Sequence, residues 1–119
     1  MKIFQEFTFE AAHKLPMVPD THKCHRLHGH NYRVRVECEG PLHPDFGWVA
    51  DFGVVEDVCN GLKQILDHRY LNDINGLENP TAENIAEWLL SQFRLTVLPF
   101  TSVTVWERDD CGAIAEAKP

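Results

Sequence analysis

The sequence predicts an α+β domain in which two helices cover one face of a four-stranded antiparallel sheet. Four segments alternate apolar and polar residues with a period of two, as half-buried strands do: 3–13, 28–39, 102–108 and 113–117. Two further segments carry apolar residues at helical spacing: 54–66 and 82–93. The predicted order is therefore strand, strand, helix, helix, strand, strand, because both helical segments lie between the second and third strands.

The first two strands carry histidines on their apolar faces. His13 ends the apolar face of 3–13, and His28 and His30 begin that of 28–39. Side chains two residues apart leave the same face of a strand, and antiparallel pairing brings the ends of two strands together. Three neutral nitrogen ligands with an open fourth position are typical of catalytic rather than structural zinc. We therefore predict a metal site formed by these three histidines.

A reactive thiol, Cys24, precedes His28 by four residues in the segment 14–27, which its prolines and polar residues mark as a loop. The cationic neighbours Lys23 and Arg26 favour the thiolate form of this cysteine. Cys24 is either a fourth ligand that closes the metal site or an independent acid/base beside the metal.

The first helix ends at Asp67-His68. A carboxylate can fix the tautomer of an imidazole and raise its basicity, so this pair is a candidate proton relay. Adjacent residues do not readily hydrogen-bond side chain to side chain, however, and a polar helix terminus is the alternative interpretation. The segment 69–80 is rich in Asn, Asp and Gly and is predicted to be irregular. Thr81 is the expected N-cap of the second helix.

Glu107 shares one face of the third strand with Val103 and Val105, so its carboxylate is expected to point into the core or a pocket. An unpaired buried carboxylate is costly. A ligand with two adjacent N–H donors, such as an aminopyrimidinone edge, would be a suitable partner. An intramolecular pair with an arginine is the alternative.

Length and charge restrict the class of protein. The 119 residues are expected to form one domain, 1–119, and the net charge of −7 argues against a general nucleic-acid binder. No apolar run is long enough to cross a membrane or resembles a signal peptide, so we expect a cytoplasmic protein that does not interact with membranes. Four cysteines without disulfide-scaffold spacing fit reduced thiols in that compartment.

The segment between His13 and Glu37 reverses this charge. It carries five cations against a single acid, Asp20: Lys14, Lys23, Arg26, Arg33 and Arg35. These cations either attract a small anionic substrate or are solvated loop and strand charges.

Six motifs, in order along nearly the whole chain, resemble the 6-pyruvoyltetrahydropterin synthase family: Phe9-Glu10-Ala11-Ala12-His13, Cys24-x-x-x-His28-Gly29-His30-Asn31-Tyr32, Asp51-Phe52, Leu66-Asp67-His68, Glu78-Asn79-Pro80-Thr81-Ala82-Glu83-Asn84 and Val105-Trp106-Glu107. Within this set, the three residues between Cys24 and His28 resemble the bacterial branch that forms 6-carboxytetrahydropterin. The branch that forms the pyruvoyl product usually has a longer spacing there.

The resemblance implies a tunnelling fold (T-fold), in which such subunits form barrels, commonly trimers stacked as a homohexamer. It implies conversion of 7,8-dihydroneopterin triphosphate to 6-carboxy-5,6,7,8-tetrahydropterin, acetaldehyde and triphosphate, an early step towards queuosine and other 7-deazapurines. The active site is expected to span two subunits.

Roles for individual residues follow from the same resemblance. His13, His28 and His30 would hold Zn²⁺. Cys24 would accept a proton, and His68 with Asp67 would relay protons. Glu107 would anchor the pterin ring, with Thr81 as a further substrate-binding residue. The candidates for contact with the triphosphate are three cations: Lys14, Lys23 and Arg26.

Other functions remain open at this point. A sister enzyme of the family would eliminate triphosphate and stop at the pyruvoyl product, or cleave a different side chain. A non-catalytic protein with structural zinc would use Cys24 as a fourth ligand. A hydrolytic zinc enzyme of the carbonic-anhydrase kind would need neither Cys24 nor Glu107. His22 or His25 could replace one of the three predicted ligands.

Overall fold

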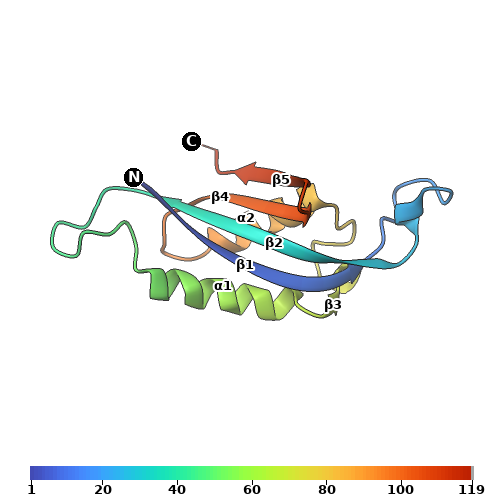
Figure 1. Cartoon of the computed structure of the whole chain (residues 1–119), viewed down its shortest axis with the longest axis horizontal. Helices are drawn as coiled ribbons and strands as arrows, with labels where there is room; N and C mark the ends of the chain where they lie inside the picture. The colour runs from blue at the N-terminus through green and yellow to red at the C-terminus, as the bar shows by residue number, and fades with distance from the viewer. Residues whose placement is uncertain (119) are drawn as a thin grey trace.

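A computed structural model describes residues 1–118, which form a five-stranded sheet with two α-helices on one of its faces (Figure 1). The elements, in chain order, are β1 (Lys2–His13), β2 (His28–Glu39), α1 (Phe52–Leu66), β3 (Arg69–Tyr70), α2 (Ala82–Phe93), β4 (Phe100–Arg108) and β5 (Cys111–Glu116). The strands lie side by side in the order β3-β1-β2-β4-β5. The predicted α+β class, the order of the six long elements and the placement of both helices on one face are confirmed.

The predicted number of strands was wrong. The segment 69–80, predicted to be irregular, begins with β3, which pairs in parallel with β1 at Ala11 and Ala12. The sheet is therefore neither four-stranded nor wholly antiparallel. A strand of two residues is too short to show alternation, and its pairing depends on where α1 delivers the chain, which is a tertiary contact. A 3₁₀ turn, Leu71–Asp73, follows directly.

Both helices begin at side-chain caps. The Thr81 hydroxyl accepts a hydrogen bond from the Asn84 backbone N–H at 3.1 Å, which confirms the predicted N-cap of α2. Asp51 caps α1 in the same way through the Gly53 N–H at 2.8 Å. The first helix therefore starts two residues before the predicted position, because the cap precedes the apolar periodicity.

The alternation in β1 and β2 separates a covered face from an open one. Inward side chains such as Phe9 and Tyr32, whose rings stack at 4.8 Å, are buried beneath the helices. The outward side chains Glu6 and Glu10 lie on the face that neither helix covers. A helix long and apolar enough to cross a membrane is not found among residues 1–118.

The pairing register of β1 with β2 positions the histidines. His13 lies opposite His28, and Ala11 lies opposite His30. These pairs stand at the end of the sheet next to the loop 14–27, far along the hairpin from the N-terminus (Figure 1). The register therefore brings the three rings to one end of the covered face.

Candidate metal centre and active site

The three predicted histidines form one cluster. Each offers a ring nitrogen, and these nitrogens all lie within 4.8 Å of one another. His13 is fully buried, whereas His28 and His30 are partly buried. Neither His22, His25 nor Cys24 belongs to the group, so the cluster found within residues 1–118 consists of the three histidines predicted as ligands.

Backbone carbonyls fix the orientation of two of the rings. The Pro80 oxygen lies 2.8 Å from His13 Nδ1, and the Arg26 oxygen lies 2.7 Å from His28 Nδ1. A carbonyl oxygen can only accept a hydrogen bond, so each Nδ1 must carry the proton. In the neutral rings, both Nε2 atoms therefore present lone pairs. Metal-binding histidines commonly make this kind of contact through the nitrogen that does not face the metal.

The cluster fits a cation. His13 Nε2 and His28 Nε2 are 3.0 Å apart, so two lone pairs face each other unless a positive charge lies between them. His30 Nε2 is buried and has no hydrogen-bond partner in the described chain. The Tyr32 hydroxyl is almost equidistant from Nδ1 and Nε2 of His13, at 3.2 and 3.3 Å.

A metal ion accounts for this arrangement better than a proton does. Burial lowers the pKa of His13, and the two neighbouring imidazoles lower it further, although the Pro80 hydrogen bond opposes them. Burial also lowers the pKa of His30, against the attraction of Glu107. Neutral rings are the form that binds a metal, so the cluster is held ready for one.

Glu107 lies at the edge of the cluster. Its Oε1 is 3.3 Å from His30 Nε2 and 3.5 Å from His13 Nε2, and its side chain is 28% exposed. The contact with His30 is close but lacks hydrogen-bond alignment, which is why that nitrogen has no partner. The intramolecular arginine considered for Glu107 is not its partner in the described residues. The carboxylate instead extends the histidine cluster with a negative charge.

Asp67 and His68 do contact each other, contrary to the expectation for adjacent side chains. Asp67 Oδ2 lies 2.9 Å from His68 Nδ1. His68 adopts a left-handed backbone with φ 57°, which turns its ring back toward the preceding carboxylate. The Asp67 pKa is lowered, first by the hydrogen bond from the Glu10 backbone N–H and then by the His68 side chain. The two side chains therefore form a carboxylate–imidazole contact at the end of α1.

Comparison with known proteins identifies the family to which the chain belongs. The model of the 6-pyruvoyl tetrahydropterin synthase family matches residues 2–118. The chain belongs to this family. A Synechocystis 6-carboxy-5,6,7,8-tetrahydropterin synthase is 43% identical over 102 residues, covering 82% of this chain and 78% of its own. A Pyrococcus furiosus dihydroneopterin monophosphate aldolase is 32% identical over 118 residues, covering 97% of this chain and 96% of its own.

Solved structures of the family agree on the fold. The Caenorhabditis elegans 6-pyruvoyl tetrahydropterin synthase superimposes with a TM-score of 0.91 and 24% identity, covering 99% of this chain and 96% of that one. The T-fold implied by the sequence resemblance is thereby confirmed.

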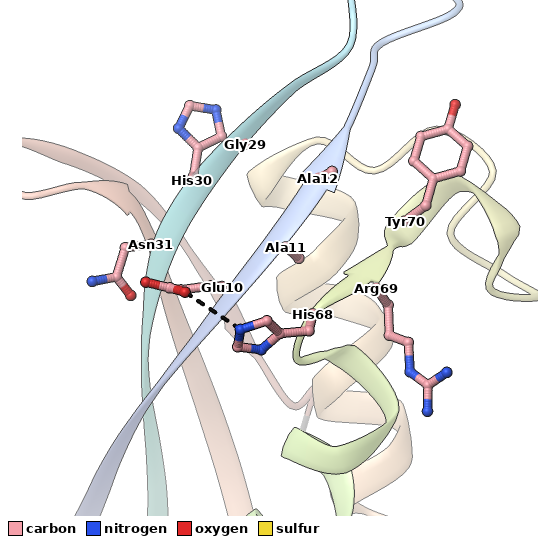
Figure 2. A pocket seen from close by; sticks show the side chains of 9 residues that line it. All are labelled: Glu10, Ala11, Ala12, Gly29, His30, Asn31, His68, Arg69 and Tyr70. Carbon is pink, nitrogen blue, oxygen red and sulfur yellow. Dashed lines mark ion pairs between the residues drawn. The ribbon is translucent and has the colours of Figure 1, made fainter.

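Two cavities flank the elements that carry the candidate residues. One, of about 550 Å³, lies where β1, β2 and β3 meet and is lined by residues that include Glu10, His30, His68 and Tyr70 (Figure 2). The other, of about 420 Å³, is lined by Glu107, Glu83 and the start of β5. The chain thus offers acid/base groups and carboxylates in two separate hollows.

The surroundings of three residues near the candidate site differ from what the sequence predicted. Glu83 lines the second cavity, although the sequence suggested only a first-turn charge at the N-terminus of α2. Glu10 contacts both Asp67 and His68. Thr81, predicted to bind substrate, uses its hydroxyl oxygen to cap α2 and is not among the cavity-lining residues. No sequence pattern distinguishes Glu10 from the other outward acids of β1.

The four cysteines differ in environment, and none is disulfide-bonded in the described chain. Cys38 and Cys59 are buried, and burial raises the pKa of their thiols to about 11 and about 12. Cys24 and Cys111 are partly exposed. Accessibility therefore sets Cys24 apart from the two core thiols, and it lies in the loop that directly precedes two of the clustered histidines.

Proposed function

We propose that this chain is a zinc-dependent lyase that converts 7,8-dihydroneopterin triphosphate to 6-carboxy-5,6,7,8-tetrahydropterin, acetaldehyde and triphosphate. The observation that carries the proposal is the cluster of His13, His28 and His30, in which two Nε2 lone pairs face each other at 3.0 Å. The similarity to relatives that bear the 6-carboxytetrahydropterin synthase name gives the substrate class.

The three histidines would hold zinc and leave a fourth position open to the substrate, since Cys24 is outside the group. The chemistry that zinc supplies when bound is Lewis-acid polarisation of substrate oxygen atoms, which eases loss of a proton from the adjacent carbon. The cluster's partial exposure at His28 and His30 supports access by a small molecule.

Two groups of this chain would then move protons. Cys24 would accept a proton from the substrate side chain, and His68 would exchange a proton with the ring system. Asp67 orients the His68 imidazole through the 2.9 Å contact to Nδ1. His68 lies on the outer side of β1, so we propose that it serves the site of a neighbouring subunit.

Glu107 would anchor the pterin. Its carboxylate faces a cavity beside the histidines and can accept two parallel N–H bonds from an aminopyrimidinone edge. Thr81, the N-cap of α2, would contribute to substrate binding, since Ala82 and Glu83, which follow it, line the same cavity. Lys14, Lys23 and Arg26 are the proposed partners of the triphosphate.

The assembly we propose is a homohexamer, a dimer of trimers. The outer edge of β1 is covered by β3 only at Ala11 and Ala12, and β5 is the last strand of the described sheet. Such open edges readily pair with another strand. A sedimentation mass equal to one chain would count against the proposed homohexamer. We further place the enzyme in the cytoplasm, on the route to queuosine or another 7-deazapurine.

The decisive experiment is a product assay. Purified, zinc-loaded protein is supplied with dihydroneopterin triphosphate, and acetaldehyde and the pterin product are followed together. Equal amounts of acetaldehyde and 6-carboxytetrahydropterin are expected. A pyruvoyl product without acetaldehyde would assign the chain to the elimination reaction instead.

The variant Cys24→Ala separates catalysis from structural zinc binding. If Cys24 is the base, turnover is lost while zinc content and melting temperature stay unchanged. Loss of zinc together with folding would identify Cys24 as a ligand and overturn the catalytic assignment. The matched control is Thr21→Ala, an exposed residue of the same loop, which is expected to keep both activity and zinc.

A second candidate function follows from the relative named dihydroneopterin monophosphate aldolase, which matches 97% of this chain. The same metal and acid/base groups suit carbon–carbon cleavage of a monophosphate. Parallel assays with the mono- and triphosphate of dihydroneopterin at equal concentration discriminate the two: a higher kcat/KM for the monophosphate would replace the first proposal.

A further inference from the structure

Asn72 binds the backbone of the residue that follows the candidate metal ligand His13. Its Nδ2 donates to the Lys14 carbonyl oxygen at 2.8 Å, and its Oδ1 accepts the Lys14 N–H at 3.1 Å. The two contacts fix the orientation of the amide, because an N–H must face Oδ1 and a carbonyl must face Nδ2. β3 pairs with β1 at Ala11 and Ala12, beside that end of β1 (Figure 1). The Asn72 side chain therefore continues this pairing beyond the end of both strands.

The contact with Lys14 continues to Cys24 through a single peptide unit. The Lys14 carbonyl and the Leu15 N–H belong to the same peptide bond, which is planar. This N–H donates to the Cys24 carbonyl oxygen at 2.7 Å. Asn72 therefore sets the plane of that peptide bond, and the plane sets the direction in which Leu15 holds the Cys24 backbone.

Asn72 is itself held in place. It lies in the 3₁₀ turn that follows β3, next to the fully buried Leu71, and its Nδ2 also lies 3.4 Å from the Glu78 carbonyl oxygen. The Pro80 carbonyl of the same segment orients the His13 ring. The segment that follows β3 thus supports both a candidate metal ligand and the loop with the candidate base.

A second hydrogen bond of the Cys24 backbone lies within its own loop. The Cys24 N–H donates to His22 Nδ1 at 3.0 Å, which caps the short 3₁₀ turn that contains Cys24. Such a cap shapes the turn but moves with the loop, so it does not fix the thiol relative to the histidine cluster. On the β2 side, the Arg26 carbonyl anchors the loop through the His28 ring. Asn72 provides the corresponding anchor on the β1 side.

We propose that Asn72 is a positioning residue that holds Cys24 in place relative to the histidine cluster by fixing the peptide plane between Lys14 and Leu15. This role rests on the proposed function, in which Cys24 accepts a proton from the substrate side chain. A base must lie within hydrogen-bond reach of the proton that it removes, so a small displacement of the loop lowers the rate of that step. Asn72 acts only through the backbone and touches no reacting atom.

The first test measures the exchange of backbone amide hydrogens with solvent by NMR. In the parent protein, the Lys14 and Leu15 N–H groups are expected to exchange more slowly than those of an unstructured peptide. Asn72→Ala is expected to accelerate both by about two- to tenfold, the factor that corresponds to the net contribution of one hydrogen bond. The Leu15 N–H bonds to Cys24 and not to Asn72, so its acceleration reports transmission through the peptide unit.

The matched control for this exchange is Asn75→Ala. Asn75 is an exposed asparagine of the same segment, and its side chain is not hydrogen-bonded to Lys14 in the described residues. The Lys14 and Leu15 N–H groups are therefore expected to keep the parent rates in this variant.

The second test measures turnover of the zinc-loaded protein. Asn72→Ala is expected to lower kcat by a similar factor, about two- to tenfold, with KM unchanged, because the loop carries the base. Asn72→Asp keeps the shape of the side chain but turns a second acceptor towards the Lys14 carbonyl, so its kcat is expected to fall at least as far. Asn75→Ala is again the control and should keep the parent kcat.

The outcomes separate this role from others. A lower melting temperature with the parent kcat in both Asn72 variants would reduce Asn72 to a structural contact and overturn the proposal. A raised KM with the parent kcat would overturn it in favour of Lys14 and the triphosphate. A Leu15 N–H that exchanges in the parent as fast as in an unstructured peptide would overturn it even if no variant folded. No turnover by the parent would overturn the proposed function, while the exchange rates would still decide whether Asn72 holds the Cys24 loop.

Discussion

The histidine cluster and the Asp67–His68 pair are built in opposite ways. The cluster lies on the covered face, where His13 is 0% exposed and backbone carbonyls orient its rings. His68 lies at the open edge with its side chain 74% exposed, and a strand of two residues holds it. One chain therefore brings its three candidate metal ligands together alone but leaves the candidate proton-transfer pair without cover. Acid/base groups gain strength when water is excluded, so in the proposed assembly the exposed pair is the part that a partner subunit would cover.

The largest expected effect is that of a substitution in the histidine cluster. His28→Ala removes one of three ligands, and we expect metal affinity to fall at least about 100-fold and turnover to be lost. Competition with a chromophoric chelator measures the affinity. The control His22→Ala changes a histidine outside the cluster and is expected to keep full affinity. Equal losses in both variants would mean that the ligand set is wrong.

A substitution in the exposed Asp67–His68 pair is expected to lower turnover without releasing the metal. Asp67→Asn leaves the metal bound but removes the charge that orients His68, so kcat is expected to fall about 100-fold or more. Steady-state kinetics with metal analysis on the same sample separate the two effects. Asp57→Asn, an exposed aspartate on the same helix, is the control and should behave like the parent. Metal loss in Asp67→Asn would show that the two regions are not independent.

The stability of the metal-free protein should depend on pH through the buried region. The pKa of His13 and that of His30 are lowered in the folded state, so between pH 7 and 5 the unfolded chain binds more protons than the folded one. Stability therefore rises with pH in this window and falls on acidification. Thermal melts in the presence of a chelator measure the trend. A melting temperature that stays level or rises from pH 7 to pH 5 would contradict it.

The smallest effect concerns the backbone of the exposed region. At a φ of 57° a residue with a Cβ is strained, so His68→Gly should be more stable than His68→Ala by about 1 kcal/mol. Urea unfolding at a fixed protein concentration measures the difference. The order should invert at Asn60, an exposed position within α1, where alanine is favoured by a similar amount. The same order at both positions would remove the evidence for strain at His68.

Sequence patterns of period two and 3.6 were sufficient to predict which residues lie on the covered face of the sheet. The alternation in 3–13 and 28–39 predicted that His13, His28 and His30 would converge, and the structure brings them together. This works because burial and strand geometry act on each residue according to its position in the repeat. The N-cap at Thr81 was predictable for the same local reason.

The open edge was not predictable in this way. β3, the left-handed φ of His68 and the contacts of Glu10 arise where α1 delivers the chain against β1. None of these features repeats along the sequence, so no periodic pattern of residues could indicate them. The expectation that the adjacent side chains of Asp67 and His68 would not meet was wrong, because a single backbone dihedral angle decides whether they do.

The place of the histidines in the hairpin also bears on folding kinetics. His13 and His28 face each other where β1 and β2 meet their 14–27 connection, so they are the first pair to approach when the hairpin closes from its loop. Closing this long connection costs entropy before any strand contact forms, and a metal held by both rings would offset that cost and keep the strands in register while the distant ends pair. Stopped-flow refolding should therefore be faster with zinc than with chelator, and the acceleration should disappear in His28→Ala.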